Sequence, residues 1–324
     1  MKKIFAIILI FSLFCLSAQT RSIQIVNASI NDFTNSIYIY QSYNMYNEGY
    51  YYYDSNPNTS YSIIILDFGA PQYGNRVYGI GKYGSGPGQF TPFTGTNSIV
   101  NDVNQFIAGY NANPSHSGKY RGIAIGFNTS VDVITQYGGN FTDFGRALKS
   151  ALTQVTLTGY INHIYATIDA EQGSDFKLTP SQVRSIIDGF SAGSSPYYFM
   201  IDFGDDELGT NPGSATQNGW TADDVWYVAY GAVLDFPIPE IYFKDMAQEW
   251  SALSLWAYNN KGGAIVFDGV SSENGVNGTL YDSESYTALL QALQNNPITY
   301  QSDLYNNSNM IPKGYDFYIH RYPY

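Results

Sequence analysis

The chain has little positive charge and few charged residues of either sign. Among its 324 residues, 15 are Lys or Arg and 27 are Asp or Glu, so the formal net charge is −12. Only 13% of the residues are charged. A protein this acidic is a poor ligand for the phosphate backbone of nucleic acids or for an anionic membrane. We therefore expect a monomer that has no nucleic-acid partner.

Cysteine is almost absent as well. The single one, Cys15, lies in an N-terminal segment with the features of a secretory signal peptide. Lys2 and Lys3 form its positive region, residues 4–16 its apolar core, and residues 17–18 the small residues before cleavage. The mature protein would then contain neither disulfides nor a catalytic thiol. No later stretch is long and apolar enough to span a membrane, so we expect a secreted protein with no membrane association after cleavage.

Other common catalytic motifs are missing. His116, His163 and His320 form no metal-spaced pair and lie in no G-x-S-x-G turn, which argues against zinc and serine-hydrolase chemistry. The glycine-rich residues 73–88 contain no Walker pattern. Their Gly-Ile-Gly does not lie between a clear strand and a helix, which argues against nucleotide binding. We expect no cofactor.

Aromatic residues are abundant at 17%, and most of them are tyrosines. Low charge with many Tyr, Asn, Ser and Gly residues is typical of surfaces that bind sugars, and also of stable extracellular proteins. Residues 37–53 are the richest in tyrosine. Because Tyr favours strands, we expect one or two edge strands there, after a short strand at 22–26. The alternative is a tyrosine ladder that binds sugar.

From residue 61 onward, apolar runs alternate with helical patterns. The predicted strands are residues 62–68, 77–80, 121–127, 164–168, 197–203, 224–231, 238–243 and 264–267. The predicted helices, which carry apolar stripes, are residues 98–110, 143–157, 179–190, 245–258 and 283–293. This α/β order predicts a distorted TIM-like barrel, a fold of about 250 residues, with an open doubly wound sheet as the alternative. In the barrel, the ends of strands 62–68 and 264–267 should lie side by side.

The chain thus divides into four predicted segments. Residues 1–18 are the signal peptide, and residues 19–60 are a Tyr-, Asn- and Ser-rich N-terminal β extension. Residues 61–298 form the barrel domain, and residues 299–324 form an aromatic tail.

The strand ending in Asp169-Ala-Glu171 carries the strongest signal for chemistry. Alternation places Asp169 and Glu171 on the same side of one strand end. Two adjacent carboxylates raise each other's pKa, so one can act as an acid while its neighbour is charged. The alternative is a strand end whose acids face water or cap the next helix.

Polar residues also follow the other predicted strands. They are Asp67, Asn128, Asp169, Glu171, Asp202, Asp205, Asp206 and Asp268. In a TIM barrel these ends converge on the face where active sites form. A ring of carboxylates with few cations resembles the clefts of glycosidases, where an acid and a base flank an oxocarbenium-like transition state. The same ring can bind a divalent cation, with Asp205-Asp206-Glu207 as the best place for it.

Three further residues are candidates on the last predicted strands. Glu240 is a second catalytic carboxylate if it faces inward, and structural if it lies near the strand start. Trp226 and Tyr230 share one face of predicted strand 224–231 and can reach the cleft.

Blocks of sequence in a fixed order resemble a family of secreted proteins best known from actinomycetes. The blocks are ILDFGAP (65–71), IAIGFNTS (123–130), IDAE (168–171), FGDD (203–206), DDVWYVAYGA (223–232), PIPEIY (237–242) and QEW (248–250). The chain lacks the cysteines that often follow the FGD block, and its tyrosine-rich N-terminal part differs. The resemblance implies a glycoside-hydrolase-type barrel but no particular reaction. The D-x-E at a strand end is also similar to that of family 25 lysozymes and chitinases.

These features predict a secreted, glycoside-hydrolase-like protein that acts on a polysaccharide or cell-wall glycan. Glu171 would be the general acid, while Asp169, Asp67 and Glu240 would stabilise positive charge or activate water. Asn128, Asp202, Asp205, Trp226, Tyr230 and Asp268 would contact the substrate. The alternative is a non-catalytic carbohydrate-binding or surface protein on a retained barrel, which needs aromatic platforms but no pair of carboxylates.

Overall fold

The computed structural model describes residues 34–52, 61–84, 90–130, 132–172, 178–193, 200–202, 204–216, 218–232, 235–265, 267, 270–272, 278–296 and 316–319. The predicted signal peptide, the predicted strand at 22–26 and Asp268 lie outside these residues.

A parallel sheet of eight strands, ordered β10-β11-β1-β2-β6-β7-β8-β9, forms the centre of the protein. Its strands are β1 (Thr34–Tyr38), β2 (Tyr61–Asp67), β6 (Tyr120–Asn128), β7 (Ile161–Asp169), β8 (Met200–Asp202), β9 (Asp235–Pro237), β10 (Val270–Ser272) and β11 (Asp316–Ile319). The continuous apolar runs of β2 and β6 are buried on both faces, as parallel strands require. The prediction of an α/β protein is confirmed.

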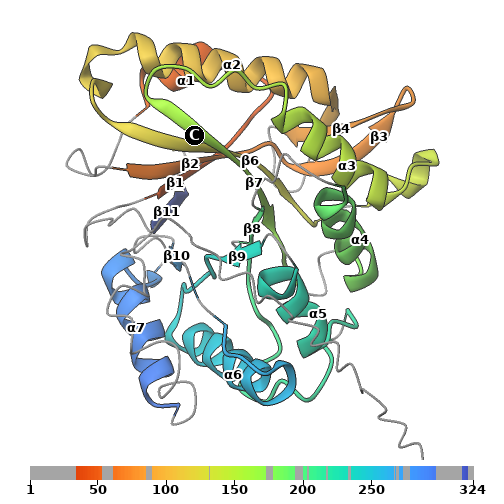
Figure 1. Ribbon diagram of the computed structural model, residues 1–324, viewed down its shortest axis with the longest axis vertical. Helices are drawn as coiled ribbons and strands as arrows, with labels where there is room; N and C mark the ends of the chain where they lie inside the picture. Colours follow the sequence, from red (N-terminus) through yellow and green to blue (C-terminus); the bar gives the residue numbers. More distant parts are fainter. Residues whose placement is uncertain are drawn as a thin grey trace, which may run out of the picture.

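Helices surround this sheet in Figure 1. They are α1 (Met45–Tyr50), α2 (Thr96–Ala112), α3 (Phe141–Leu152), α4 (Pro180–Ser191), α5 (Ala222–Trp226), α6 (Lys244–Lys261) and α7 (Asp282–Gln294). Short 3-10 turns occur at Pro114–His116 and Thr135–Tyr137. The five predicted helices are confirmed as α2, α3, α4, α6 and α7, but α3 ends at Leu152 and not at the predicted residue 157. The Thr179-Pro180 start of α4 is a capping box in which Thr179 and Gln182 each bond the other's backbone N–H.

A second sheet of three antiparallel strands follows β2 directly. It consists of β3 (Ala70–Gly74), β4 (Val77–Tyr83) and β5 (Phe90–Gly95). The predicted strand 77–80 is confirmed as part of β4. The hairpin between β3 and β4 turns at Asn75 and Arg76, whose φ angles of 51° and 62° are those of a type I′ turn.

The N-terminal and C-terminal segments take part in the main sheet. β1 pairs with β2 on one side and with β11 on the other, and residues 45–50 form the helix α1. The prediction of one or two edge strands at residues 37–53 is therefore wrong. β11 in turn pairs with β10. Since β1 and β11 lie between β2 and β10, the predicted adjacency of strands 62–68 and 264–267 is also wrong. Parallel neighbours that are distant in sequence leave no local signal.

Residues 224–231 are helical, so the prediction of a strand there is wrong. They form the end of α5 and a π-helical turn, Tyr227–Gly231. Buried apolar side chains recur at Val225, Val228, Ala229 and Ala232, which is a helical period. The helix start is also encoded, because Thr221 and Asp224 form a capping box.

The last predicted strands are displaced. The sequence predicts a strand at residues 238–243. The structure instead has β9 just before this range, at Asp235–Pro237, and within the range only an isolated parallel bridge between Glu240 and Ser271. Ala264, Ile265 and Phe267 lie before β10 and outside any strand. The bridge joins the segment after β9 to β10, the two strands at the ends of the sheet order.

Two pairs of consecutive helices cross in near backbone contact, and each crossing depends on glycine. A Cβ atom added at Gly109 of α2 would lie 1.9 Å from the Tyr46 carbonyl oxygen of α1. One added at Gly189 of α4 would lie 1.9 Å from the Thr142 carbonyl oxygen of α3. Only a residue without a side chain allows this approach.

Gly109→Ala and Gly189→Ala are therefore expected to destabilise the protein. Alanine favours the helix by about 1 kcal/mol, but pushing the helices apart costs about 1–3 kcal/mol or more. Thermal and urea unfolding would measure the difference. Gly263→Ala is the control, because a Cβ atom there meets nothing within 4 Å. Unchanged stability in both helix variants would show that the helices separate without cost.

Candidate functional site

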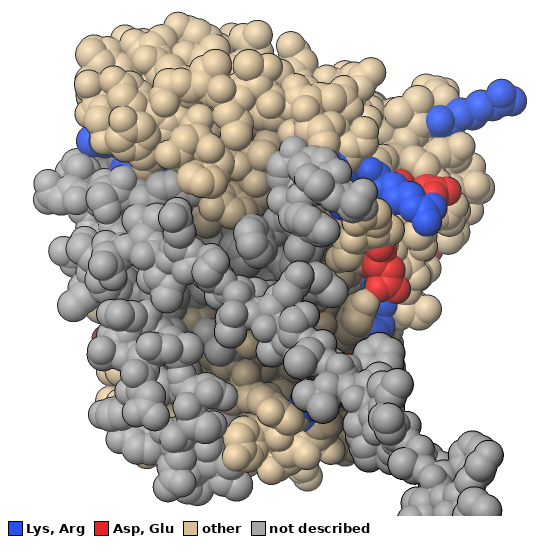
Figure 2. Space-filling model, in the orientation of Figure 1, with Lys and Arg blue, Asp and Glu red and all other residues tan. Residues whose placement is uncertain are grey.

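Most of the candidate acids are buried rather than displayed on the surface. Figure 2 shows few Asp and Glu side chains among the described atoms of the face it presents. By contrast, Asp67, Asp169, Asp202, Asp206 and Glu240 are each at most 7% exposed. Buried carboxyls are rare unless they are paired or used.

The register of the parallel strands places several candidates on one face of the sheet. Tyr38 of β1 is level with Asp67 of β2, which is level with Gly126 of β6. Two residues further along β6, Asn128 is level with Asp169 of β7. Side chains in register or two residues apart share a face. Tyr38, Asp67, Asn128 and Asp169 therefore share one face at the carboxyl ends of their strands, which we call the inner face.

The opposite face carries the apolar core. Leu66, Ile125 and Ile168, each offset by one residue from the inner-face positions, are completely buried in the main hydrophobic cluster with residues of α2, α3 and α4. The alternation between these faces explains why the acids of adjacent strands meet.

Asp67 is held by a tyrosine that the second sheet supplies. The Tyr83 hydroxyl, at the end of β4, donates a hydrogen bond of 2.8 Å to Asp67 Oδ2, and the Gly69 N–H donates one of 2.9 Å to Oδ1. Asn128 Nδ2 donates to the Tyr83 hydroxyl at 2.6 Å. Burial raises the pKa of Asp67 to about 7, against the effect of these two donors. The three-stranded sheet β3–β5 thus positions and polarises the carboxyl of Asp67.

Asp169 and Glu171 are fixed by Thr129, which follows β6. The Thr129 N–H and hydroxyl both donate to the Asp169 carbonyl at 3.2 Å, and the Glu171 N–H donates to Thr129 Oγ1 at 3.1 Å. Burial, then Glu171, Glu240, Asp67 and Asp202, raise the pKa of Asp169. Asp169 Oδ1 is buried without a hydrogen-bond partner.

Glu171 lies between two groups of acids. Burial, followed by the charges of Asp205, Glu207 and Asp67, raises the pKa of Glu171 to about 8. Its carboxyl therefore binds a proton at neutral pH, while the backbone around it is fixed by Thr129. An acid in this state can donate a proton to a bound group.

Glu240 completes the inner group. Its N–H donates to the Gly204 carbonyl at 3.0 Å, so the chain after β9 continues along the end of β8. Its charge is among the causes that raise the pKa values of Asp169 and Tyr38. The Tyr242 hydroxyl donates a short hydrogen bond to Glu240 Oε1. Glu240 is thus buried among the inner carboxyls, and its role as a second catalytic carboxylate stays a prediction.

Asp202 faces the other side of the sheet from this group, although its charge is among the causes that raise the pKa of Asp169. By register it is level with Ile168, on the core face of the sheet. Its carboxylate accepts a hydrogen bond of 3.2 Å from the Gly204 N–H, and burial raises its pKa to about 7. Asp202 is therefore linked to the inner face through its charge, and its contact with a substrate stays a prediction.

A second group of acids extends from Glu171 and is called here the acidic track. Asp205, Asp206 and Glu207 follow β8, while Asp245 and Glu249 come from α6. Burial and the charges of Asp205, Asp245 and Glu207 raise the pKa of Glu249 to about 7. Burial and the charges of Glu207 and Asp245 likewise outweigh a backbone N–H in raising the pKa of Asp205 to about 7.

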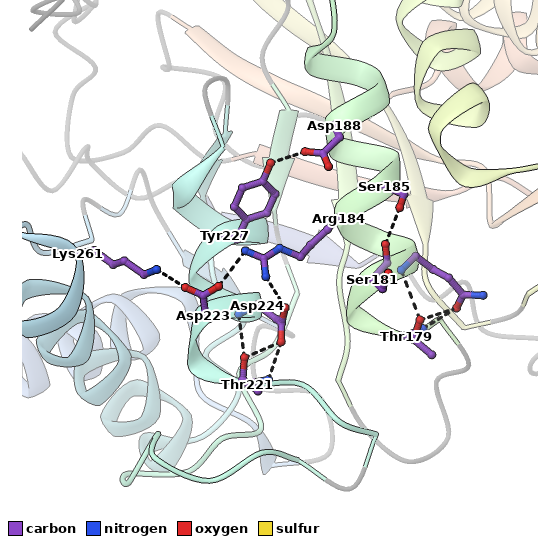
Figure 3. A network of polar contacts seen from close by, with 11 residues as sticks. Thr179, Ser181, Arg184, Ser185, Asp188, Thr221, Asp223, Asp224, Tyr227 and Lys261 are labelled. Carbon is purple, nitrogen blue, oxygen red and sulfur yellow. Dashed lines mark hydrogen bonds and ion pairs between the residues drawn. The ribbon is translucent and has the colours of Figure 1, made fainter. Parts of the chain in front are cut away.

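Trp226 and Tyr230 belong to a different environment, because the segment that carries them is helical. Lys261 Nζ lies 4.5 Å from the centre of the Trp226 ring and forms an ion pair with Asp223. Figure 3 shows this network between α4, α5 and α6, in which Arg184 binds Asp223 and Asp224. Tyr230 packs against the hydrophobic core. The assignment of these two residues to a strand is thus wrong, and their contact with a substrate stays a prediction.

Metal and histidine chemistry gain no support from the described part of the chain. Within it, no three His, Cys, Asp or Glu side chains are placed to hold a metal ion together. His116 is buried with its ring nitrogens 2.9 Å from the Tyr110 carbonyl and 3.1 Å from the Tyr52 carbonyl, a structural position. His163 is exposed on β7, and His320 lies outside the described residues.

Sequence reasoning missed the residues that support the carboxyls. Tyr38 and Tyr83 lie edge to face, with ring centres 4.8 Å apart, beside Asp67. Tyr242 and Glu249 fall inside the PIPEIY and QEW blocks, which is the only signal the sequence holds for them. Tyr83 has no such signal, because only the fold of β3–β5 brings it to Asp67.

Comparison of the chain with known family models, with curated proteins and with solved structures finds no match. Among the described helices, none has both the length and the apolar character needed to cross a membrane.

The buried acids make the stability of the folded state depend on pH. The pKa values of Asp67 and Asp202 rise from 3.8 to about 7, and that of Glu171 rises from 4.5 to about 8. A raised pKa means that the folded state holds protons which the unfolded state has released. The resulting stability is complete below about pH 4 and is lost as the pH rises through 7 and 8.

We therefore expect the melting temperature to fall between pH 5 and pH 8.5. One pKa unit corresponds to about 1.4 kcal/mol, so even part of these shifts has a large effect. Thermal melts across this range would measure it, and Asp202→Asn should flatten the curve. A melting temperature that rises over the same range would show that the acids are ionised and paired in the folded state.

Proposed function

We propose that this protein is a glycoside hydrolase that acts on a polysaccharide, with Glu171 as the general acid. The observation that supports this most is the environment of Glu171. Its pKa is raised to about 8, and it lies within the electrostatic reach of Asp67. A protonated carboxyl beside a second carboxylate is the arrangement that hydrolysis of a glycosidic bond requires.

The two carboxyls can take different roles because their surroundings differ. Glu171 receives no hydrogen bond to its carboxyl from the described residues, and its acid neighbours favour the protonated form. Asp67 accepts hydrogen bonds from Tyr83 and Gly69, both of which favour the ionised form. In the proposed mechanism Glu171 protonates the leaving oxygen. Asp67 activates water or attacks the sugar, and Asp169 and Glu240 stabilise the developing positive charge.

The proposal includes a closed TIM-like barrel. Ile241 N–H donates to the Ser271 carbonyl at 2.8 Å, and Ser271 N–H donates to the Pro239 carbonyl at 2.7 Å. These bonds link the two ends of the strand order. They support closure of the sheet around the inner face, with the carboxyls at the carboxyl ends of the strands, where barrel enzymes have their active sites.

Substrate contacts in this proposal come from aromatic and polar residues near the carboxyls. Tyr40 lies beside Tyr83, with ring centres 5.9 Å apart, and beside Tyr43, at 5.3 Å. All three rings can pack on sugar faces. Asn128 and Asp205 supply polar contacts, and Asp268 remains a candidate outside the described residues. Membership of the actinomycete family, secretion and a monomeric state are parts of the same proposal.

Glu171→Gln is expected to remove activity without unfolding the protein. Glutamine keeps the size of the side chain but has no proton to transfer, so hydrolysis should fall by about a hundredfold or more. The assay measures new reducing ends from chitin, peptidoglycan, chitosan and β-glucans, with thermal melts in parallel. Glu48→Gln, the same change on α1, is the control and should keep full activity.

Two results would contradict catalysis. If the wild type binds a polymer but releases no reducing ends, the protein is a carbohydrate-binding module on the same fold. If Glu171→Gln retains full hydrolysis, another group is the acid.

A further inference from the structure

A chain of hydrogen bonds runs from the end of β6 to the carboxyl of Asp67. The Ser130 N–H and hydroxyl both donate to Asn128 Oδ1, at 3.2 and 2.5 Å. Asn128 Nδ2 donates to the Tyr83 hydroxyl at 2.6 Å, and that hydroxyl donates to Asp67 Oδ2 at 2.8 Å. The chain thus joins β6, β4 and β2, which are separated in the sequence.

The direction of this chain is fixed by its first member. A backbone N–H can only donate, so the side-chain atom of Asn128 that faces the Ser130 nitrogen is the amide oxygen. The amide nitrogen, which only donates, then faces Tyr83. Because the Tyr83 oxygen accepts from Asn128, its single proton points to Asp67.

The second oxygen of Asp67 is also an acceptor. The Gly69 N–H donates to Oδ1 at 2.9 Å, and the φ angle of Gly69 is 109°, a conformation that favours glycine. The Gly69 carbonyl in turn accepts from the Asn128 N–H at 3.0 Å. Asp67, Gly69, Asn128 and Tyr83 therefore form a closed frame in which both carboxylate oxygens accept hydrogen bonds from fixed donors.

Tyr83 is itself held by the segment after β1. It forms a parallel bridge with Tyr40, and its carbonyl accepts from the Gln41 N–H at 3.3 Å. Its ring meets that of Tyr38 edge to face. The hydroxyl is therefore directed at Asp67 before any substrate binds.

The surroundings of Asp67 make these donors necessary. Titratable groups come from several elements around it: Tyr38 of β1, Tyr83 of β4, Asp169 of β7, Glu171 after β7 and Glu240 after β9. All of them are neutral or negative. Lys82, which precedes Tyr83, is a cation bound to Asp102. Burial raises the pKa of Asp67, and the hydrogen bonds from Tyr83 and Gly69 oppose that effect.

We propose that Tyr83 and Asn128 are positioning residues that keep the Asp67 carboxyl ionised for the role proposed for it. This inference deepens the proposed function and rests on it. Tyr83 acts by a charge-assisted hydrogen bond, which is stronger than one between neutral groups. Asn128 acts through Tyr83, because it directs the hydroxyl proton to Asp67, in addition to its proposed contact with the substrate.

Carbon-13 NMR of the full chain, labelled at the aspartate carboxyls, tests this proposal. The Asp67 signal is identified by its absence in Asp67→Asn, and its titration is followed from pH 4 to pH 9. In Tyr83→Phe we expect the titration to move to higher pH, so that the ionised fraction of Asp67 at pH 7 falls by roughly threefold to tenfold. Asn128→Leu keeps the shape of the side chain and should have a smaller effect in the same direction. The double variant should equal Tyr83→Phe.

Tyr78→Phe is the matched control. Tyr78 lies on the same strand, and its hydroxyl accepts a hydrogen bond of 3.1 Å from the Asn140 N–H. Its loss should leave the titration of Asp67 unchanged. Thermal melts run on every variant, and Asn128→Leu gives the result if Tyr83→Phe does not fold.

The pH dependence of hydrolysis separates positioning from a structural defect. In the proposed mechanism, an ionised Asp67 sets the acidic limb of kcat/KM, and a protonated Glu171 sets the basic limb. Tyr83→Phe should move the acidic limb to higher pH and leave the basic limb in place. A structural defect would instead lower kcat/KM at every pH.

The failures of the two proposals are distinguishable. If Asp67 titrates alike in the wild type, Tyr83→Phe and Asn128→Leu, this inference is wrong, whether or not the wild type hydrolyses a glycan. Additive effects of the two substitutions would overturn the role of Asn128. If the titration moves as expected but the wild type hydrolyses none of the polymers named above, the effect of the chain on Asp67 is confirmed and the proposed function fails.

Discussion

Burial of carboxyl groups beside one another is the constraint on which the rest of the structure depends. Each of Asp67, Asp169 and Glu240 loses most of its contact with water, and their charges oppose one another. Ionising all of them together would cost more than a marginally stable fold can bear. The folded state therefore keeps protons on some carboxyls and directs N–H and O–H donors to others, such as Gly69 and Tyr83 to Asp67.

The surrounding fold is built to make that arrangement possible. β6 packs closely against Asp67 and Thr167 at Gly126. Glycine is needed there because a Cβ atom would lie 2.7 Å from Thr167 Oγ1. The three-stranded sheet β3–β5 places Tyr83, at the end of β4, beside the end of β2. On the outside, glycine crossings bring α1 onto α2 and α3 onto α4. Close packing of the helices fixes the strands, and the strands fix the positions of the acids.

Much of this could be predicted from the sequence where the signal is local. The runs of β2, β6 and β7, the five helices and the Asp169–Glu171 pair all follow from periodicity and from end signals. The proximity of Asp67 and Asp169 can also be predicted from the sequence, since the carboxyl ends of parallel strands lie at one edge of their sheet. Functional roles do not follow from this placement.

What the sequence does not reveal depends on long-range contacts or on ambiguous patterns. Residues 224–231 satisfy both the strand and the helix period, and only the Thr221–Asp224 capping box decides between them. Residues that join the site from elsewhere, such as Tyr83 and Glu249, are placed by tertiary structure. Sequence spacing does not encode that placement.

The protonated state of the acids also links stability to ligand binding. Without a ligand, binding a proton is the least costly way to neutralise a buried carboxyl. The folded state is therefore most stable when those protons are bound. A ligand that supplies hydrogen-bond donors or positive charge replaces the protons, and its binding energy then offsets the cost of ionisation. Paired surface acids such as Asp143 do not couple in this way, because hydrogen bonds from Asn140 and Arg146 already lower the pKa of that carboxyl. The buried acids are thus groups whose charge a bound ligand can change.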